Sequence, residues 1–262
     1  MGVFKKLTER YRENKASYVV WLILQILVVG TLVRHLMLGD LHSAFVCLLT
    51  LALFLAPVLV KTTFKVKIPA TLEILVLCFI FSAEILGEIN NYYMRIPGWD
   101  TILHTLNGFA AAGVGLSLMI MVDAGSQRIR MTAGFTALMA FCFSMTVGVV
   151  WEFGEYAADS YFGKDSQRDT YANVIRSSTL DETKTNTVIT IDGIDRTVLY
   201  NAEGEIIGEF TEGYLDLGIH DTMKDLLVNA VGAAVFCIFG YFYVKYGKLK
   251  FLDNWLIRKR TD

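Results

Sequence analysis

The chain has 262 residues, of which 54% are hydrophobic and 19% are charged, and its mean hydropathy is +0.45. This composition is too apolar for an ordinary soluble domain, in which about 25% of residues are charged. The net charge is −2 and no basic stripe is visible, so we expect no nucleic-acid partner.

A basic amphipathic segment, residues 1–17, comes first and is predicted to be cytoplasmic. Six apolar runs follow, each long enough to cross a hydrocarbon core of about 30 Å. We place them at Tyr18–Leu38, His42–Val60, Pro69–Asn90, Thr101–Val122, Met131–Ala157 and Met223–Lys245. The sequence therefore predicts an all-α polytopic membrane protein, with the first five helices within 18–157, the sixth at 223–245 and a basic tail at 246–262.

Residues 158–222 form a polar connection that is too long for an ordinary turn. Within it, TVITIDGIDRTVLYNAEGEIIGEF alternates β-branched and polar residues around an Asp-Gly and a Glu-Gly turn. This pattern predicts a small β-hairpin or meander between helices 5 and 6.

The orientation follows from the distribution of Lys and Arg among the short segments. With six spans, all the basic segments lie on one side: the N-terminal segment, the second and fourth connections, and the tail. We therefore expect a multi-pass protein of a bacterial plasma membrane, with both termini cytoplasmic and the long loop outside. On the cytoplasmic side, Glu73 is predicted to be interfacial and FLDNWLIRKRTD to form an interfacial helix.

Ionisable side chains inside membrane helices are costly, so a group of them indicates a site. Four spans carry such side chains or amides near their predicted outer ends: Glu84 and Glu88 on the third, Asp100, His104 and Asn107 on the fourth, Glu152 and Glu155 on the fifth, and Asp221, Asp225 and Asn229 on the sixth. Helix register thus predicts that four helices bring carboxylates to one depth.

Carboxylates in a confined site of low dielectric constant need bound cations, shared protons or water. Carboxylate, carboxamide and imidazole groups suit a hard or borderline divalent ion. The expected ligands are Glu88, Asp100, His104, Glu152, Glu155, Asp221, Asp225 and Asn229, with Glu84 and Asn107 as further polar groups. Gly87, Gly108 and Gly232 are expected to allow close helix contact beside them.

For single residues, a structural role without a ligand remains an open alternative. A carboxylate pair such as Glu84 with Glu88 can be solvated at the membrane interface, and His104 can be a hydrogen-bonded interior histidine. Asp100 and Asp221 stand near helix N-termini, where acids act as caps. Asp225 falls deeper in its span and is harder to explain this way.

Three motifs resemble those of the YjdF-like family of bacterial membrane-spanning proteins, and more distantly the VanZ-like proteins. They are WDTILH at Trp99–His104, VWEFGE at Val150–Glu155 and DTMKDLLVNAVGA at Asp221–Ala233. The resemblance covers roughly residues 80–240 and implies a multi-helix membrane fold with site residues Asp100, His104, Glu152, Asp225 and Asn229. VanZ-like proteins often have Gln where this chain has Glu155. The resemblance points to the cell envelope and names no reaction.

Three functions remain open from the sequence. The first is a metal-dependent membrane hydrolase or transferase that acts on a lipid or lipid-linked envelope substrate, with catalytic residues Asp100, His104, Glu152 and Asp225. The second is a cation- or proton-coupled transporter, although the inner half of the chain offers few acids. The third is a binding or sensing protein that uses the outer loop. A monomer is large enough to enclose a polar site, and a homo-oligomer is equally compatible with the sequence.

Overall fold

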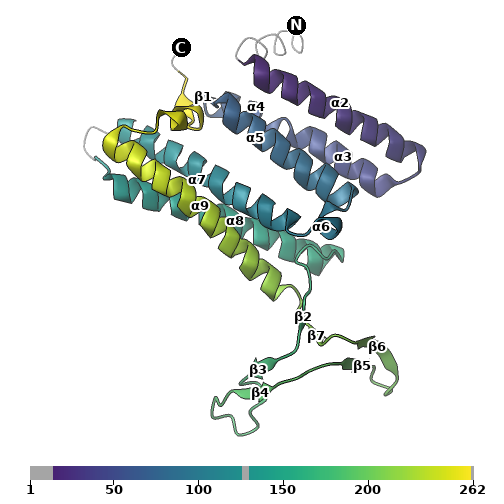
Figure 1. Cartoon of the computed structure of the whole chain (residues 1–262). Helices are drawn as coiled ribbons and strands as arrows, with labels where there is room; N and C mark the ends of the chain where they lie inside the picture. Colours follow the sequence, from purple (N-terminus) through teal and green to yellow (C-terminus); the bar gives the residue numbers. More distant parts are fainter. Residues whose placement is uncertain (1–13, 126–129, 261–262) are drawn as a thin grey trace. The chain divides into compact units, whose positions relative to one another are not determined.

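The computed structural model describes residues 14–125 and 130–260 (Figure 1). Most of the predicted amphipathic segment 1–17 lies outside these residues. The chain divides into two compact units, one formed by residues 1–148 with 226–262 and the other by 149–225.

Six helical segments among the described residues are long and apolar enough to cross a membrane, which confirms the predicted number. They are α2 (Lys15–Met37), α3 (Leu41–Leu53) with α4 (Ala56–Thr63), α5 (Ala70–Phe81) with η1 (Ser82–Ile89), α7 (Trp99–Gly125), α8 (Ala133–Phe162) and α9 (Ile219–Tyr246). A short helix, α6 (Tyr92–Arg95), precedes α7. Helices α8 and α9 extend past the predicted ends because their polar outer turns carry no apolar signal.

Two of the six segments are not continuous α-helices. The second breaks at Phe54–Leu55, and Pro57 stands in the first turn of α4, where its missing N–H costs no helical hydrogen bond. The third changes at Ser82 into the π-helix η1, whose widened turn is seen in the bond from Asn90 N–H to Ile85 O (3.1 Å). Such π-segments are frequent at functional sites, and this one carries Glu84 and Glu88.

The first unit has three apolar clusters in its core. One joins α2, α3, α5 and η1 around Leu24, Phe54 and Leu77. Another joins α7, α8 and α9 around Leu116 and Phe236. The third lies between these helix groups, and its buried members are Val66, Leu72 and Ile257. Many other large apolar side chains of the helices are exposed on the surface, as expected of helices that face lipid.

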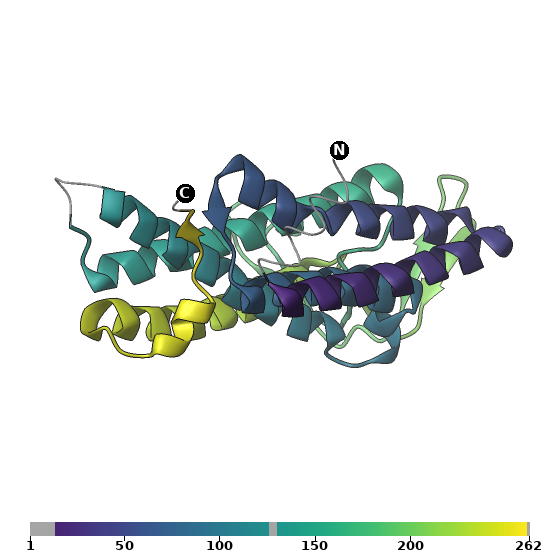
Figure 2. The same cartoon turned by 90° about the horizontal axis from the view of Figure 1, so that it is seen from above.

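The C-terminal segment is part of this core, so the prediction of an interfacial helix is wrong. After α9 the chain reverses through Gly247 and Leu249, both with positive φ, into the short 3-10 helix η2 (Lys250–Asn254). Strand β8 (Arg258–Lys259) then pairs antiparallel with β1 (Val66–Lys67). Figure 2 shows the yellow C-terminal segment from above. Leu252, Leu256 and Ile257 are buried, and covering this apolar surface outweighs the intrinsic helical tendency of the segment.

Glu73, in the first turn of α5, is 1% exposed and so is covered by protein, and its predicted depth at the membrane interface stays a prediction. Its Oε2 accepts hydrogen bonds from the Ser17 hydroxyl (2.8 Å) and from Lys61 Nζ (2.8 Å). The bonds connect α2, α4 and α5. Because a buried charge that loses its oppositely charged partner is left poorly solvated, removal of either member of the Lys61–Glu73 pair is costly.

The second unit contains three antiparallel strand pairs between α8 and α9. They are β2 (Tyr171–Ala172) with β7 (Tyr214–Leu215), β3 (Ile175–Ser177) with β4 (Ile189–Ile191), and β5 (Thr197–Tyr200) with β6 (Ile206–Phe210). The predicted β content is confirmed. Strands β5 and β6 form a hairpin around the expected Glu-Gly turn, where Gly204 has φ +81°. The Asp-Gly turn does not close a hairpin, because β4 pairs with the earlier β3.

Asp181 organises the loop between β3 and β4. Its carboxylate accepts hydrogen bonds from the hydroxyl of Thr183 and from the amides of Thr187, Thr183 and Thr185, and these hold the pKa of Asp181 below its usual range. A carboxylate with a lowered pKa in the folded state stabilises that state above the unfolded pKa of about 3.9. The contribution is lost as the pH falls toward the lower folded value.

We therefore expect the amides of Thr183, Thr185 and Thr187 to exchange faster with solvent deuterium below pH 4 than at pH 6, after correction for intrinsic rates. Asp181→Asn should give the fast exchange at both pH values. Asp192→Asn is the matched control, since Asp192 accepts a bond from the adjacent Gly193 amide. Unchanged protection in Asp181→Asn at pH 6 would contradict this role.

Candidate functional site

Asn229 on α9 lies at the centre of the contact between α7, α8 and α9, and it is fully buried. Its Oδ1 accepts a hydrogen bond from Asn107 Nδ2 (3.1 Å), and its Nδ2 donates to the backbone oxygen of Ser144 (3.4 Å). The amide is thereby satisfied by one partner on each neighbouring helix. We call Asn107, Ser144 and Asn229 the amide bracket.

Glycines bring the three helices close enough for these bonds. A Cβ built on Gly108 would overlap the carbonyl oxygen of Asn229, and one on Gly232 would overlap the carbonyl oxygen of Thr105. A Cβ on Gly148 would lie 2.9 Å from Asn229 Nδ2. Small residues at helix contacts are typical of membrane bundles. The close contact predicted at Gly108 and Gly232 is confirmed, whereas Gly87 instead makes room for the ring of Tyr93.

Asp100 and His104 lie one turn apart on α7, on the side of the amide bracket that leads to the helix N-terminus. His104 Nε2 is 3.6 Å from Asp100 Oδ1, and the two side chains are 9% and 20% exposed. An imidazole held beside a carboxylate in a largely buried position has a defined orientation, which is a requirement for both metal binding and proton transfer.

Glu84 and Glu88 lie on η1, in the same unit. Glu88 Oε1 is 3.5 Å from Nε2 of His42 on α3, a residue that the sequence reading left outside the site. Both side chains of this pair are exposed, at 43% and 60%, so the interaction is weak. Glu88 therefore contacts α3, which belongs to the helix group of α2, α3 and α5.

The other predicted acids belong to the second unit, at the end of α8 and the start of α9. Glu152 and Asp225 are 4% and 1% exposed. Glu155 accepts a hydrogen bond from Trp151 Nε1 (2.7 Å). Asp221 accepts one from the Arg168 amide (3.1 Å), and Lys224 Nζ lies 3.4 Å from it and 3.9 Å from Asp225. Asp221 thus fastens the loop to the start of α9.

Two further aspartates hold the base of the loop, and the sequence reading missed both. Asp159 accepts the amides of Ser166 (2.6 Å) and Gln167 (2.8 Å). Asp216 accepts the amides of Thr170, Gly218 and His220 and contacts the His220 ring. Burial alone would raise the pKa of Asp216, but these bonds outweigh it and hold the pKa below its usual range. Asp216 stands three residues before Ile219, the first residue of α9, so the usual N-cap position, here Gly218, would not have identified it.

Comparison with known proteins identifies the family of the chain. The model of the family described as "Predicted membrane protein (DUF2238)" matches residues 18–246. The chain belongs to this family. No curated protein and no solved structure gives a significant match.

The DUF2238 match spans all six helices and the loop between α8 and α9. It agrees with the polytopic membrane fold and states no reaction. The resemblance to the YjdF-like and VanZ-like proteins, which the sequence motifs suggested, stays a prediction.

The glycine contacts of this DUF2238 protein yield a stability prediction. Gly232→Ala should lower the melting temperature in detergent markedly, because the added methyl group forces α7 and α9 apart; such overpacking typically costs about 1–3 kcal/mol. Gly30→Ala is the matched control on α2, since a Cβ there meets no atom within 4 Å. Equal melting temperatures for the two variants would contradict the close contact.

Proposed function

We propose that this protein is a membrane enzyme that holds one divalent metal ion with Asp100, His104, Glu152 and Asp225 and acts on a lipid or lipid-linked envelope substrate. Each of these residues supplies a carboxylate or imidazole group of the kind that could hold a metal ion. The observation that carries the proposal is the register of these residues relative to the amide bracket.

The register is read from the contact around Asn229. His104 precedes Gly108 by four residues on α7, Asp225 precedes Asn229 by four on α9, and Glu152 follows Gly148 by four on α8. Four residues are about one helical turn. Successive membrane helices run in opposite directions, so a step back along α7 and α9 and a step forward along α8 lead toward the same membrane face. If α7, α8 and α9 keep regular helical geometry for one more turn, His104, Glu152 and Asp225 lie at the same depth in the membrane.

The chemistry of the residues supports a metal more than a purely structural role. Three carboxylates near one imidazole repel one another unless a cation or shared protons compensate them. Asp100 Oδ1 lies 3.6 Å from His104 Nε2, so the carboxylate and the imidazole could bind the same ion. When bound, a divalent ion would polarise a phosphoryl or carbonyl oxygen of the substrate, or lower the pKa of a water.

Several of the remaining acids and amides support the helices or the loop. Asn229 Oδ1 accepts from Asn107, and the Asp221 carboxylate accepts from the Arg168 amide. Glu155 accepts from Trp151, and Glu88 pairs with His42. We assign these residues to the support of the helices and the loop. Glu152 is then the carboxylate best suited to accept a proton from a substrate hydroxyl or a water.

The distribution of basic residues supports an extracytoplasmic location for the site. The proposed ligands lie at the membrane face opposite the one that the Lys and Arg bias predicts to be cytoplasmic. A site near the ends of membrane helices is reached from the headgroup layer, which favours a lipid or lipid-linked substrate over a soluble metabolite.

Metal binding is tested by elemental mass spectrometry of detergent-purified protein. We expect about one divalent ion per chain in the wild type and loss of that ion in His104→Ala and in Asp225→Ala. His42→Ala is the matched control, a histidine on α3 that is not among the proposed ligands. Metal contents that stay equal in all four proteins, or no metal even after candidate ions are added, would refute the metal site and favour shared protons.

The enzymatic part of the proposal is tested with the metal-loaded protein in mixed micelles. We expect inorganic phosphate or a free headgroup to be released from a short-chain phospholipid or a polyprenyl diphosphate. Glu152→Gln should keep a large part of the metal and lower turnover by about 100-fold or more, because the amide cannot accept the proton. Equal turnover in Glu152→Gln and the wild type would refute its role as the base.

A further inference from the structure

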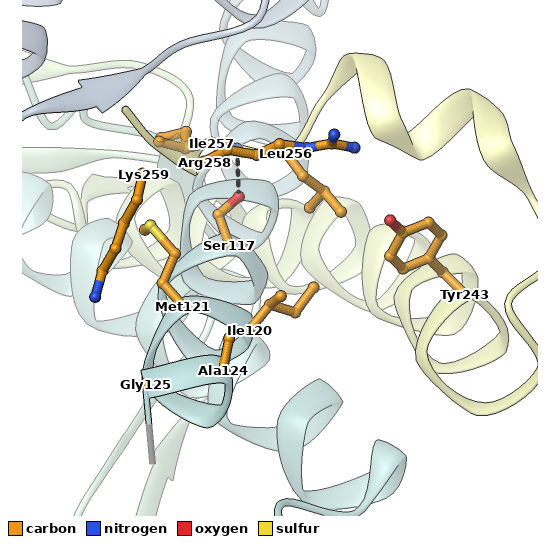
Figure 3. A pocket seen from close by; sticks show the side chains of 10 residues that line it. All are labelled: Ser117, Ile120, Met121, Ala124, Gly125, Tyr243, Leu256, Ile257, Arg258 and Lys259. Atoms are coloured by element: carbon orange, nitrogen blue, oxygen red, sulfur yellow. Dashed lines mark hydrogen bonds between the residues drawn. The ribbon is translucent and has the colours of Figure 1, made fainter. Parts of the chain in front are cut away.

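A cavity of about 320 Å³ lies at the other end of α7 from Asp100, within the first unit (Figure 3). Its walls are mostly apolar: Ile120, Met121, Ala124, Tyr243, Leu256 and Ile257. The volume is at the lower limit of the range for small-molecule sites, about 300–1,000 Å³. Arg258 and Lys259 are the two cationic side chains in its lining.

The C-terminal segment forms one wall of the cavity and is fixed to α7 by a buried bond. Ser117 Oγ accepts the N–H of Ile257 (2.9 Å), drawn as the dashed line in Figure 3, and donates to the carbonyl of Gly113 (2.7 Å). Leu256 and Ile257 are buried, and β8 continues the segment by pairing with β1. The cavity is therefore bounded by regular, hydrogen-bonded elements.

The cavity extends into the part of α7 that crosses the membrane. Ser117 precedes Gly125, the last residue of α7, by eight residues, which corresponds to about 12 Å along the helix axis. At its shallow end, Lys259 Nζ approaches Gly125. Because the ends of membrane helices lie near the headgroups, we expect the Gly125 end of the cavity at that level and the Ser117 end among acyl chains.

The rim carries an excess of positive charge. The strands β1 and β8 and their flanks, FKVKIP and WLIRKR, contain five basic and no acidic residues. We call Lys65, Lys67, Arg258, Lys259 and Arg260 the basic ribbon. Asp253, five residues before Arg258, pairs with Arg258 (2.6 Å) and also accepts from the Tyr243 hydroxyl (2.7 Å). Asp123, at the end of α7, accepts from the Met131 amide (2.7 Å).

We propose that this cavity binds one anionic phospholipid, with an acyl chain between α7 and the C-terminal segment and the phosphate against Lys259. A soluble anion would contact the basic ribbon but would leave the apolar walls in contact with water. An uncharged lipid would fill the walls but would make no use of the charge. The site is separate from the proposed metal ligands, because it lies at the membrane face that the charge bias predicts to be cytoplasmic.

The test uses the full-length protein, reconstituted into vesicles of equal phosphatidylglycerol and phosphatidylcholine, re-extracted and analysed by native mass spectrometry. We expect about one phosphatidylglycerol to be retained per wild-type chain. Ala124→Phe should abolish retention by filling the cavity. Lys259→Gln should weaken it about fivefold, the usual effect of one cation near an anionic headgroup. Lys248→Gln, an exposed lysine that does not line the cavity, should behave like the wild type.

Three results would overturn the proposal. Equal retention of phosphatidylcholine would show that the headgroup is not recognised. Loss of phosphatidylglycerol when inorganic phosphate is added would show that the site binds a soluble anion. Full retention in Ala124→Phe would place the lipid elsewhere. Should Ala124→Phe fail to fold, as judged from its thermal melt, Lys259→Gln against Lys248→Gln decides the question.

Discussion

The arrangement of α7, α8 and α9 depends on the hydrogen bonds of the buried Asn229 side-chain amide. A carboxamide inside a membrane bundle must find its partners in the protein, because lipid tails offer none. Asn107 and the Ser144 carbonyl supply them, but only if the helix backbones nearly touch. Gly108, Gly148 and Gly232 permit that approach. The hydrogen bonds of Asn229 therefore depend on these glycines.

The amide bracket also relates the fold to the proposed chemistry. A site built from buried carboxylates opposes its own formation by charge repulsion and desolvation, and the surrounding structure has to hold it together. In the first unit the bracket lies one helical turn from His104 along α7. In the second unit Asp159, Asp216 and Asp221 hold the loop by hydrogen bonds to its backbone amides. The supporting groups are thus hydrogen-bonded to backbone or amide partners.

The opposite membrane face is organised by a different principle. There the charged groups either pair, as Lys61 does with Glu73, or stay at the rim, as in the basic ribbon. The apolar residues of the C-terminal segment cover α7 and create the cavity beneath them. One chain therefore presents an acidic, hydrogen-bonded region and a basic, apolar-walled region at the two ends of the same helix.

The sequence by itself determined the six membrane helices, because a run of about 20 apolar residues has no other stable place. It also identified Asn107, Asn229, Gly108 and Gly232, since polar and small residues stand out inside such runs. Only the tertiary structure decided the partners of Glu73, the return of the C-terminal segment onto β1, and the pairing of β4 with β3. These contacts join residues far apart in the chain, and their energy comes from burial and from satisfied hydrogen bonds. A local sequence pattern indicates neither which distant residues bury one another nor which of them form hydrogen bonds.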